Sequence, residues 1–253
     1  MAWDFSTEPE FQAKLDWANE FVKREVEPLD LAFRDPFAPY DRKNPIYKKL
    51  TDPLKAEVKK QKLWACHLGP DLGGQGYGQV KLALLNELLG RSHWAPNVFG
   101  CQAPDTGNSE ILAHYGNDEQ KRRFLKPLLD GEIISAFSMT EPQGGADPRE
   151  FRCRAVRDGD QWVIDGEKYF SSHAAQADFL IAMVITNPDV PVHQGASMML
   201  VPRDAPGLTI ARTPGVGRDP YGHGHHPYVK YEGVRVPREN LLGGEGQGFA
   251  IAQ

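Results

Sequence analysis

Residues 131–147, GEIISAFSMTEPQGGAD, mark the point where the sequence changes from a helical to a β-rich pattern. Upstream, apolar residues such as Phe11, Leu15 and Ala18 recur near the 3.6-residue period of a helix. Downstream, short β-rich runs alternate with clusters of turn-forming residues. Helices followed by an unbroken series of strands predict an α+β fold, with an N-terminal all-α helical domain and then an antiparallel β-barrel-like domain.

The same two periodicities predict the individual elements. Further helices are predicted over residues 46–62, 80–89, 105–115 and 118–129. Pro53 should lie in a first helical turn or at a break, because proline has no N–H to donate. Strands are predicted over residues 134–140, 152–156, 161–164, 179–185, 197–201, 208–211 and 228–231. Turns that bound these strands are expected at Asp165-Gly166 and Glu232-Gly233, among others.

These patterns divide the chain into three parts. We expect an N-terminal α-helical domain over residues 1–133 and a middle β-domain over residues 134–242. The glycine-rich stretch 243–248 and the apolar residues after it are typical of a loop that enters a new helix. Residues 243–253 are therefore interpreted as the start of a truncated C-terminal helical domain.

Composition argues against several classes of protein. Among 253 residues, 29 are basic and 34 are acidic, which gives a net charge of −5, whereas nucleic-acid binding needs a basic surface. No apolar run is long enough for a membrane span, and the acidic N-terminus lacks the pattern of a signal peptide. Cys66, Cys101 and Cys153 are scattered, which argues against a disulfide framework. We therefore expect a cytoplasmic protein.

Residues 136–147 carry the strongest signal for a ligand. A predicted strand ends there in a loop with Gly144 and Gly145, and glycines let backbone N–H groups approach a planar or phosphorylated ligand. The loop is not a P-loop, because no Gly-Lys-Ser/Thr follows it. The glycine spacing in residues 243–248 does not fit a nicotinamide-binding Rossmann site either. From these residues alone, a purely structural turn between a strand and a loop also fits.

Several ordered motifs resemble those of the acyl-CoA dehydrogenase family. They are FSMTEP at 137–142, DGEKYFSS at 165–172, SMMLVPRDAPG at 197–207, VRVPRENLLGGEGQGF at 234–249 and GNDEQKRRFLKPLLDGE at 116–132. The run APDTGN at 103–108 resembles in particular the branch that contains human family members ten and eleven. The resemblance covers nearly the whole chain and lacks only the family's C-terminal helical domain.

The resemblance implies a flavoenzyme whose FAD ring lies against the β-domain. The cofactor-binding residues that it implies are Phe137, Ser138, Met139, Thr140, Gly145, Ala146, Phe170, Ser171 and Ser172. In the family, the segment matching 137–140 gives the ring backbone and hydroxyl hydrogen bonds, and the segment matching 170–172 packs an aromatic side chain on it. Ala146 stands where the family often has serine, so only its N–H can reach cofactor phosphates or substrate. Asn108 matches the region that lines the acyl pocket, so Ala146 and Asn108 are the implied substrate-binding residues.

The reaction implied by the resemblance is the α,β-dehydrogenation of a fatty acyl-CoA, as in fatty acid β-oxidation, with hydride transfer to N5 of the flavin. The family's catalytic carboxylate belongs to its C-terminal domain, so no catalytic residue is assigned within residues 1–253. This chain alone is expected to bind FAD weakly or not at all and to be inactive. Further implications are an acyl-CoA substrate, an electron acceptor such as electron-transfer flavoprotein, and a homo-oligomer when full length. If the source is eukaryotic, the expected location is the mitochondrial matrix.

Other interpretations stay open. A flavin-dependent oxidase or monooxygenase on the same scaffold would share these motifs, as would a non-catalytic module that binds acyl-CoA or flavin. Glu141 lies beside the predicted flavin strand and resembles a base, but the following Pro142 and the family pattern favour a structural role. His223, His225 and His226 resemble metal ligands, but no cysteine or carboxylate completes a site at an obvious spacing, so no metal site is predicted.

Overall fold

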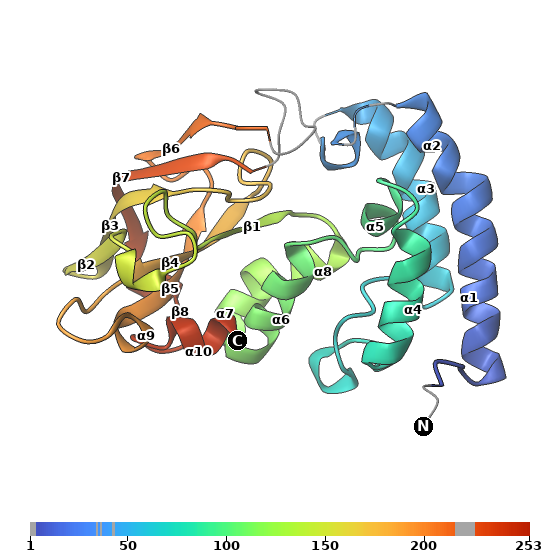
Figure 1. The fold of residues 1–253 in the computed structure, drawn as a ribbon, viewed down its shortest axis with the longest axis horizontal. Coiled ribbons are helices and arrows are strands. Elements are labelled where there is room, and N and C mark those ends of the chain that lie inside the picture. The colour runs from blue at the N-terminus through green and yellow to red at the C-terminus, as the bar shows by residue number, and fades with distance from the viewer. Residues whose placement is uncertain (1–3, 34, 36, 42–43, 216–225) are drawn as a thin grey trace. The chain divides into compact units, whose positions relative to one another are not determined.

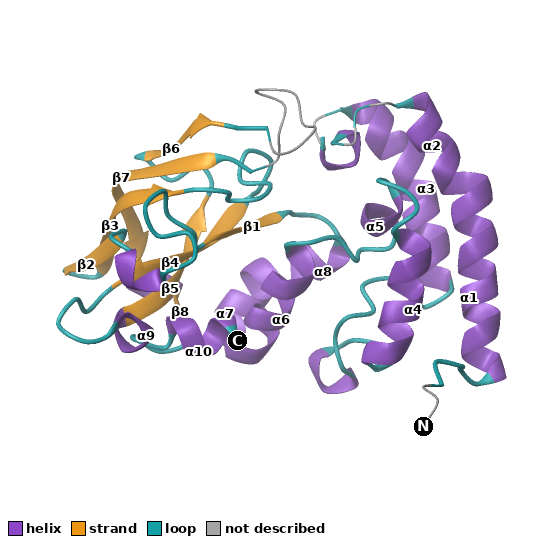
Figure 2. Ribbon diagram, viewed as in Figure 1, coloured by secondary structure: helices purple, strands orange, loops and turns teal. Residues whose placement is uncertain are grey.

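The structure is a computed structural model that describes residues 4–33, 35, 37–41, 44–215 and 226–253. It divides into two compact units, Met1–Thr106 and Gly107–Gln253. Within the described residues, the first unit contains helices and no strand, and all of the strands belong to the second (Figure 2). Packing thus divides the chain earlier than residue 133, because the helices that follow residue 106 pack within the unit that holds the sheet. The domain boundary at residue 133 stays a prediction.

The first unit is built from helices joined by turns and loops, of which residues 61–78 form a long one. Its α-helices are α1 (Pro9–Phe21), α2 (Glu27–Ala32), α3 (Pro45–Lys60), α4 (Gln79–Leu89) and α5 (Ala95–Val98). A π-helical turn η1 (Val22–Val26) joins α1 to α2, and 3₁₀ turns form η2 (Ala38–Tyr40) and η3 (Pro70–Leu72). Helix α1 buries Phe11, Leu15 and Ala18, which follow one another at intervals of four and three residues and so lie on one face. The predicted helical half is confirmed here.

The core of the first unit is rich in aromatic rings. Trp94 is fully buried, and its ring centroid lies 5.5 Å from that of Phe33 and 5.4 Å from that of Tyr47. Leu85 and Leu89, one helical turn apart on α4, complete the buried face of that helix. This unit therefore buries mainly apolar side chains.

Pro53 lies inside α3 rather than at its first turn or at a break, so that expectation was wrong. Pro53 is exposed, and so are Lys49 and Leu50 in the preceding turn. Because a proline ring removes one helical N–H, one carbonyl in the preceding turn loses its partner, but an exposed carbonyl can bond to water instead. The tertiary packing of α3 outweighs the local penalty.

The second unit begins with a short series of helices. They are α6 (Asp105–Tyr115), α7 (Asp118–Gln120), the π-helical turn η4 (Lys121–Leu125) and α8 (Lys126–Asp130). Asn117 and Gln120 form a reciprocal capping box at the start of α7. The Gln120 side chain also donates to the carbonyls of Glu239 and Leu241, at 2.8 and 2.9 Å, which ties this helix to the last strand of the sheet (Figure 1). Gly131 ends α8 in the left-handed conformation that favours glycine.

A single mixed sheet forms the rest of the second unit. Its strands are β1 (Ser135–Ser138), β2 (Arg154–Asp158), β3 (Gln161–Lys168), β4 (Phe179–Ile185), β5 (Ala196–Pro202), β6 (Leu208–Arg212), β7 (Tyr228–Pro237) and β8 (Leu241–Leu242). The order is β6-β7-β3-β2-β4-β5-β8, with β1 beside β4. Among the described residues, β1 and β2 pair with β4 in parallel and the other pairings are antiparallel. The predicted fold class is confirmed, with these parallel pairings as an addition.

The short elements of the second unit pack around this sheet. They are the 3₁₀ turns η5 (Pro148–Glu150) and η6 (Arg238–Asn240) and the helices α9 (Val192–Gly195) and α10 (Gly248–Ala252). Strands β4 and β5 are buried along nearly their whole length, which explains their continuous apolar sequences. Within the described part of the chain, no helix combines the length and the apolar character that crossing a bilayer requires.

The turns expected at Asp165-Gly166 and Glu232-Gly233 are instead the two sides of one β-bulge. Strand β3 runs through the first pair and β7 through the second, and their register shifts between Ile164 and Gly166. Gly233 adopts φ +63°, and its N–H donates to Asp165 Oδ1 at 2.8 Å. A Cβ on Gly166, where φ is +145°, would lie 2.5 Å from Cys153 Cα. Turn-forming residues therefore serve a bulge that brings β3 close to residue 153.

Candidate flavin-binding site

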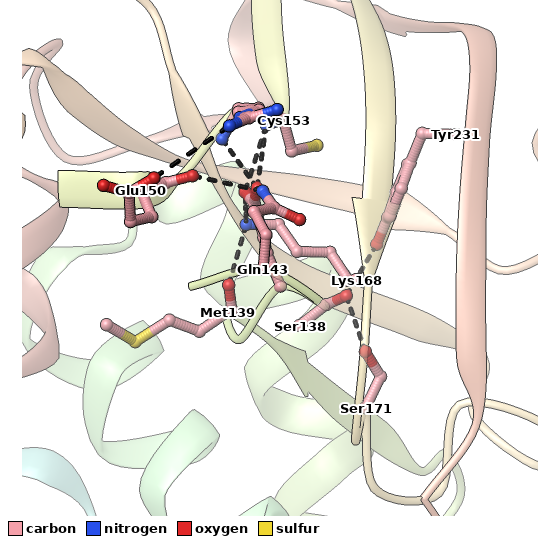
Figure 3. Close-up of polar contacts among 10 residues, drawn as sticks. Ser138, Met139, Gln143, Glu150, Cys153, Lys168, Ser171 and Tyr231 are labelled. Atoms are coloured by element: carbon pink, nitrogen blue, oxygen red, sulfur yellow. Dashed lines mark hydrogen bonds and ion pairs between the residues drawn. The ribbon is translucent and has the colours of Figure 1, made fainter. Parts of the chain in front are cut away.

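The segments 137–140 and 168–172, which are about thirty residues apart in the sequence, lie side by side. The Tyr169 N–H donates to the Thr140 carbonyl at 2.8 Å, and Lys168 Nζ donates to the Met139 carbonyl at 2.8 Å. The hydroxyls of Ser138 and Ser171 are 2.9 Å apart. Figure 3 shows Met139, Ser138, Lys168 and Ser171 meeting where β1 and β3 end. The structure thus brings together the two segments that sequence motifs connected with one ligand.

Ser138 and Ser171 belong to a buried chain of hydroxyl groups. The Tyr231 hydroxyl on β7 donates to Ser138 Oγ at 2.9 Å, and Ser138 Oγ contacts Ser171 Oγ. All three residues are buried, and burial raises the pKa of Tyr231, so that its hydroxyl keeps its proton. These hydroxyls therefore have partners within the protein. That Ser138 and Ser171 also contact a cofactor stays a prediction.

Glu141 and Lys168 form an ion pair directly beneath the end of β1. Lys168 Nζ lies 2.8 Å from Glu141 Oε1, and the exposed fractions of the two side chains are 0% and 1%. The Glu141 carboxylate also accepts from the backbone N–H groups of Arg152 (2.6 Å) and Cys153 (3.0 Å) and from Gln143 Nε2 (2.7 Å). A carboxylate held by four donors has a structural role, as the sequence predicted, and is not placed to accept a proton from substrate.

The contacts of Glu141 close the loop between residues 141 and 153. Gln143 Nε2 donates both to Glu141 and to the Glu150 carbonyl, so the two ends of the loop are joined (Figure 3). Gly145 and Ala146 lie exposed at its tip, and no atom lies within 4 Å of where a Cβ on Gly145 would be. Asp147 follows, and hydrogen bonds from Arg149 lower the pKa of its carboxyl to about 2. The backbone of Gly145 and Ala146 is thus accessible to a ligand, while the hydrogen bonds of Gln143 hold the ends of the loop in place.

Phe170 is an exposed aromatic side chain on a strained backbone. It is 46% exposed and has φ +58°, a conformation that bulky residues rarely adopt. The ring centroid of Tyr169 lies 3.9 Å from its own, so its neighbour supports it from one side. An apolar ring held open to solvent by backbone strain is a face on which a planar ligand can stack.

Ser172 continues the same segment with a half-buried hydroxyl. Its Oγ lies 2.8 Å from Nδ1 of His226. His173, the next residue, is buried, and both burial and the nearby His226 lower the pKa of its imidazole to about 4, so it is neutral near pH 7. The hydroxyl of Ser172 is therefore oriented by a histidine two residues before β7.

The groups that face outward from these segments match what an isoalloxazine ring needs. The ring has an apolar face for stacking and a polar edge with hydrogen-bond donors and acceptors. Phe170 supplies an aromatic face, and Ser172 supplies a hydroxyl. Within the described residues, the half-buried hydroxyl of Thr140 makes no hydrogen bond, so it remains available to a ligand. The residues present fit a flavin.

Asn108 has a partner within the protein. Its side-chain Nδ2 donates to Ser135 Oγ at 2.8 Å, and the residue is 2% exposed. This bond joins α6 to β1. A contact between Asn108 and substrate stays a prediction, and it would have to use the remaining atoms of the amide.

Sequence reasoning missed the residues that support the site from below, Lys168 and Tyr231, and the partner of Ser172, His226. A signal for Lys168 was available, because it shares the inward face of β3 with Trp162 and Ile164 at the strand period of two. His223 and His225 lie outside the described residues. Over the ranges that the structure describes, no group of three His, Cys, Asp or Glu side chains is arranged to hold a metal ion.

Family models match most of the chain. The model of the acyl-CoA dehydrogenase N-terminal domain matches residues 8–132, and that of the middle domain matches residues 136–228. Both matches follow the order of the predicted motifs.

Similar proteins have names from the same family, and the chain spans about three fifths or less of their length. "Probable acyl-CoA dehydrogenase FadE2" of Mycobacterium tuberculosis is 42% identical over 256 residues, which are 99% of this chain and 58% of that protein. Acyl-CoA dehydrogenase family member 11 of Homo sapiens is 43% identical over 80% of this chain and 26% of its own length. A solved structure from Mycobacterium abscessus has a TM-score of 0.84 at 35% identity, covering 98% of this chain and 63% of that one. The chain belongs to the acyl-CoA dehydrogenase family, of which it carries the N-terminal and middle domains.

Proposed function

We propose that this chain forms the flavin-ring side of the site of an FAD-dependent acyl-CoA dehydrogenase, which oxidises the α,β bond of a fatty acyl-CoA thioester. The observation that carries the proposal is the junction of segments 137–140 and 168–172 beside the exposed ring of Phe170. Family membership supports an oxidoreductase in fatty acid metabolism. The chain spans 58% of the length of FadE2, so the activity of a whole protein is part of the proposal.

The residues of this chain would hold FAD by its ring. Phe170 would stack on one face, while the hydroxyls of Thr140 and Ser172 would donate to polar atoms of the ring. The chemistry that bound FAD supplies is acceptance of a hydride from the β-carbon of the acyl chain. Fixed donors at the ring edge stabilise the negative charge that develops there during reduction, because they are already oriented before the reaction.

The exposed loop tip would meet the anionic parts of the ligands. The Ala146 N–H is the donor proposed for cofactor phosphates or for the substrate, since the alanine side chain has no hydroxyl. Abstraction of the α-proton is assigned to no residue of this chain. Glu141, which directly follows the segment 137–140, is occupied by its four donors. An electron acceptor such as electron-transfer flavoprotein, and a homo-oligomer of the whole protein, belong to the same proposal.

A titration of the purified chain with FAD, followed by the quenching of flavin fluorescence, tests this function. We expect weak but saturable binding, and we expect Phe170→Ala to weaken it about tenfold, since stacking on an aromatic ring contributes roughly 1 kcal/mol or more. Phe5→Ala, which removes a ring that is also exposed, is the matched control and should leave the affinity unchanged. The resemblance leaves weak binding and no binding open, and the proposal requires weak binding. No binding to the wild-type chain, or equal binding to the Phe170→Ala variant, would therefore contradict the proposal.

A further inference from the structure

The Glu141–Lys168 ion pair has no part in the contacts proposed above, although it lies directly beneath them. Both side chains are removed from water. Removing two charges from water is costly, and a buried ion pair is often no more stable than an apolar pair of the same size. Stability alone therefore does not explain why a buried ion pair lies at this position.

The Lys168 ammonium is fully engaged by the protein. It donates to Glu141 Oε1 at 2.8 Å and to the Met139 carbonyl at 2.8 Å. The Phe151 ring centroid lies 4.7 Å from Nζ, so the remaining side of the cation faces an aromatic ring. Glu141 in turn is fixed by the N–H groups of Arg152 and Cys153. The ammonium therefore holds the Met139 carbonyl from a rigid base (Figure 3).

The bond to the Met139 carbonyl also fixes the direction of the Thr140 N–H. The carbonyl of Met139 and the N–H of Thr140 belong to one planar trans peptide, in which the two groups point in opposite directions. Because the carbonyl points to Lys168, the N–H points away from it. The next peptide is fixed as well, since the Thr140 carbonyl accepts from Tyr169 N–H. Among the described residues, no backbone carbonyl accepts from the Thr140 N–H.

We propose that Lys168, held by Glu141, is a positioning residue that turns the Met139–Thr140 peptide so that the Thr140 N–H donates to an electronegative atom at the ring edge of the flavin. Lys168 acts through the peptide and does not itself touch the cofactor. The inference rests on the proposed function and adds a residue to it. The consequence is that neutralising a buried lysine weakens the binding of a ring that it does not contact.

The peptide can be observed by itself. Met139-Thr140 is the single Met-Thr step in the sequence, so labelling methionine carbonyls with carbon-13 and threonine amides with nitrogen-15 gives one signal in a carbonyl–amide NMR experiment. We expect this signal to move as FAD binds to the wild-type chain, because the Thr140 N–H gains an acceptor. The same titration gives the Kd for FAD.

Two variants and a control decide the role of Lys168. Lys168→Met should shift the Met139 carbonyl signal without FAD and raise the Kd about tenfold. The double variant Glu141→Gln/Lys168→Met, which leaves no unpaired buried charge, should do the same while it stays folded. Lys230→Met removes a half-buried lysine that lies opposite Glu167 on the neighbouring strand and makes no contact with the Met139 carbonyl, so it should match the wild type.

The outcomes separate this inference from the proposed function. Equal affinity of the folded double variant and the wild type for FAD would overturn the inference and leave the function standing. So would a wild-type signal that stays in place while FAD binds. Absence of FAD binding to the wild-type chain would contradict the proposed function, and the inference with it.

Discussion

The two compact units differ in what they bury. The first unit packs rings and aliphatic side chains around Trp94, and the ion pairs of Lys60, Lys81 and Arg91 described in it lie at the surface. The first unit's described buried polar residues are Thr51, Ser92, Asn97 and Asp105, whereas the second unit, around its own apolar core, buries more polar side chains and a complete ion pair. The buried polar and charged residues described in this unit are Asn108, Ser109, Gln120, Ser135, Ser138, Glu141, Lys168, Ser171, His173, Ser197 and Asn240.

Several of the buried polar side chains of the second unit lie near the candidate site, where β1 and β3 end, directly beneath the proposed ring site. A polar group inside a protein must be hydrogen-bonded, so each one fixes the geometry of its neighbours more strictly than an apolar contact does. Changes of the buried polar groups of the second unit are therefore expected to cost more stability than changes of the surface polar groups of the first.

The largest effect should come from the buried lysine. Lys168→Met leaves the Glu141 carboxylate buried without its cation, so the free energy of unfolding should fall by about 4 kcal/mol, and Glu141→Gln in the same chain should recover most of it. Lys81→Met removes the partner of Glu8 in the first unit, where the exposed fractions are 26% and 52%, and should cost less than about 1 kcal/mol. Urea denaturation of the variants measures both losses. Similar losses for the two lysines would break the comparison.

The next effect, a dependence of stability on pH, should be common to both units. Burial lowers the pKa of His67 in the first unit and of His173 in the second to about 4, and His226 adds to the effect on His173. In the unfolded chain an imidazole titrates near 6.5, so between pH 6.5 and 4 the unfolded state binds more protons than the folded state. The stability from each histidine is complete above pH 6.5 and lost as the pH falls to 4, by up to about 3 kcal/mol.

Urea denaturation at pH 7, about 5.5 and about 4 measures this loss. His67→Gln and His173→Asn should each remove part of the pH dependence, asparagine being chosen because His173 has φ +62° and asparagine tolerates that conformation. A pH dependence that survives both substitutions unchanged would show that neither imidazole is responsible.

The smallest effect concerns one hydroxyl in each unit. Tyr231→Phe removes the donor to Ser138 Oγ inside the sheet unit and should cost about 1 kcal/mol. Tyr77→Phe removes a donor to the Lys62 carbonyl at the surface of the helical unit, where water can replace it, and should cost about half as much or less. Thermal unfolding of the two variants measures the difference. A larger loss for Tyr77→Phe would reverse the expected order of the two units.

Periodicity predicted most of the elements but not how they pair. The run FLIAMVI, residues 179–185, was recognisable as a buried strand because it is apolar throughout, and it is β4. That β1 pairs with it in parallel was not predictable, because such pairing depends on contacts far apart in the sequence. The pairs Asp165-Gly166 and Glu232-Gly233 were recognised as special backbone, but a turn and a bulge use the same residue types.

Motif resemblance predicted the two segments of the candidate site, including the buried Ser138 and Ser171, but not the lysine beneath them. Motif resemblance supplied Thr140, Phe170 and Ser172, which face outward. Lys168 stood in a strand whose alternation placed it inward, and an inward lysine requires a carboxylate nearby. Glu141 could have been named as that carboxylate only by knowing that β1 and β3 end together, which is a tertiary fact.

The bulge opposite Asp165 lies where strand β3 comes closest to Cys153. At residue 166 even a methyl group would collide with the main chain of Cys153, whose N–H holds Glu141. A methyl group there would push β3 away from Cys153. The distance from the Lys168 ammonium to the Glu141 carboxylate would then increase. The ion pair between Lys168 and Glu141 thus depends on the absence of a Cβ at Gly166. Replacing this glycine would weaken an ion pair whose lysine lies two residues further along the strand.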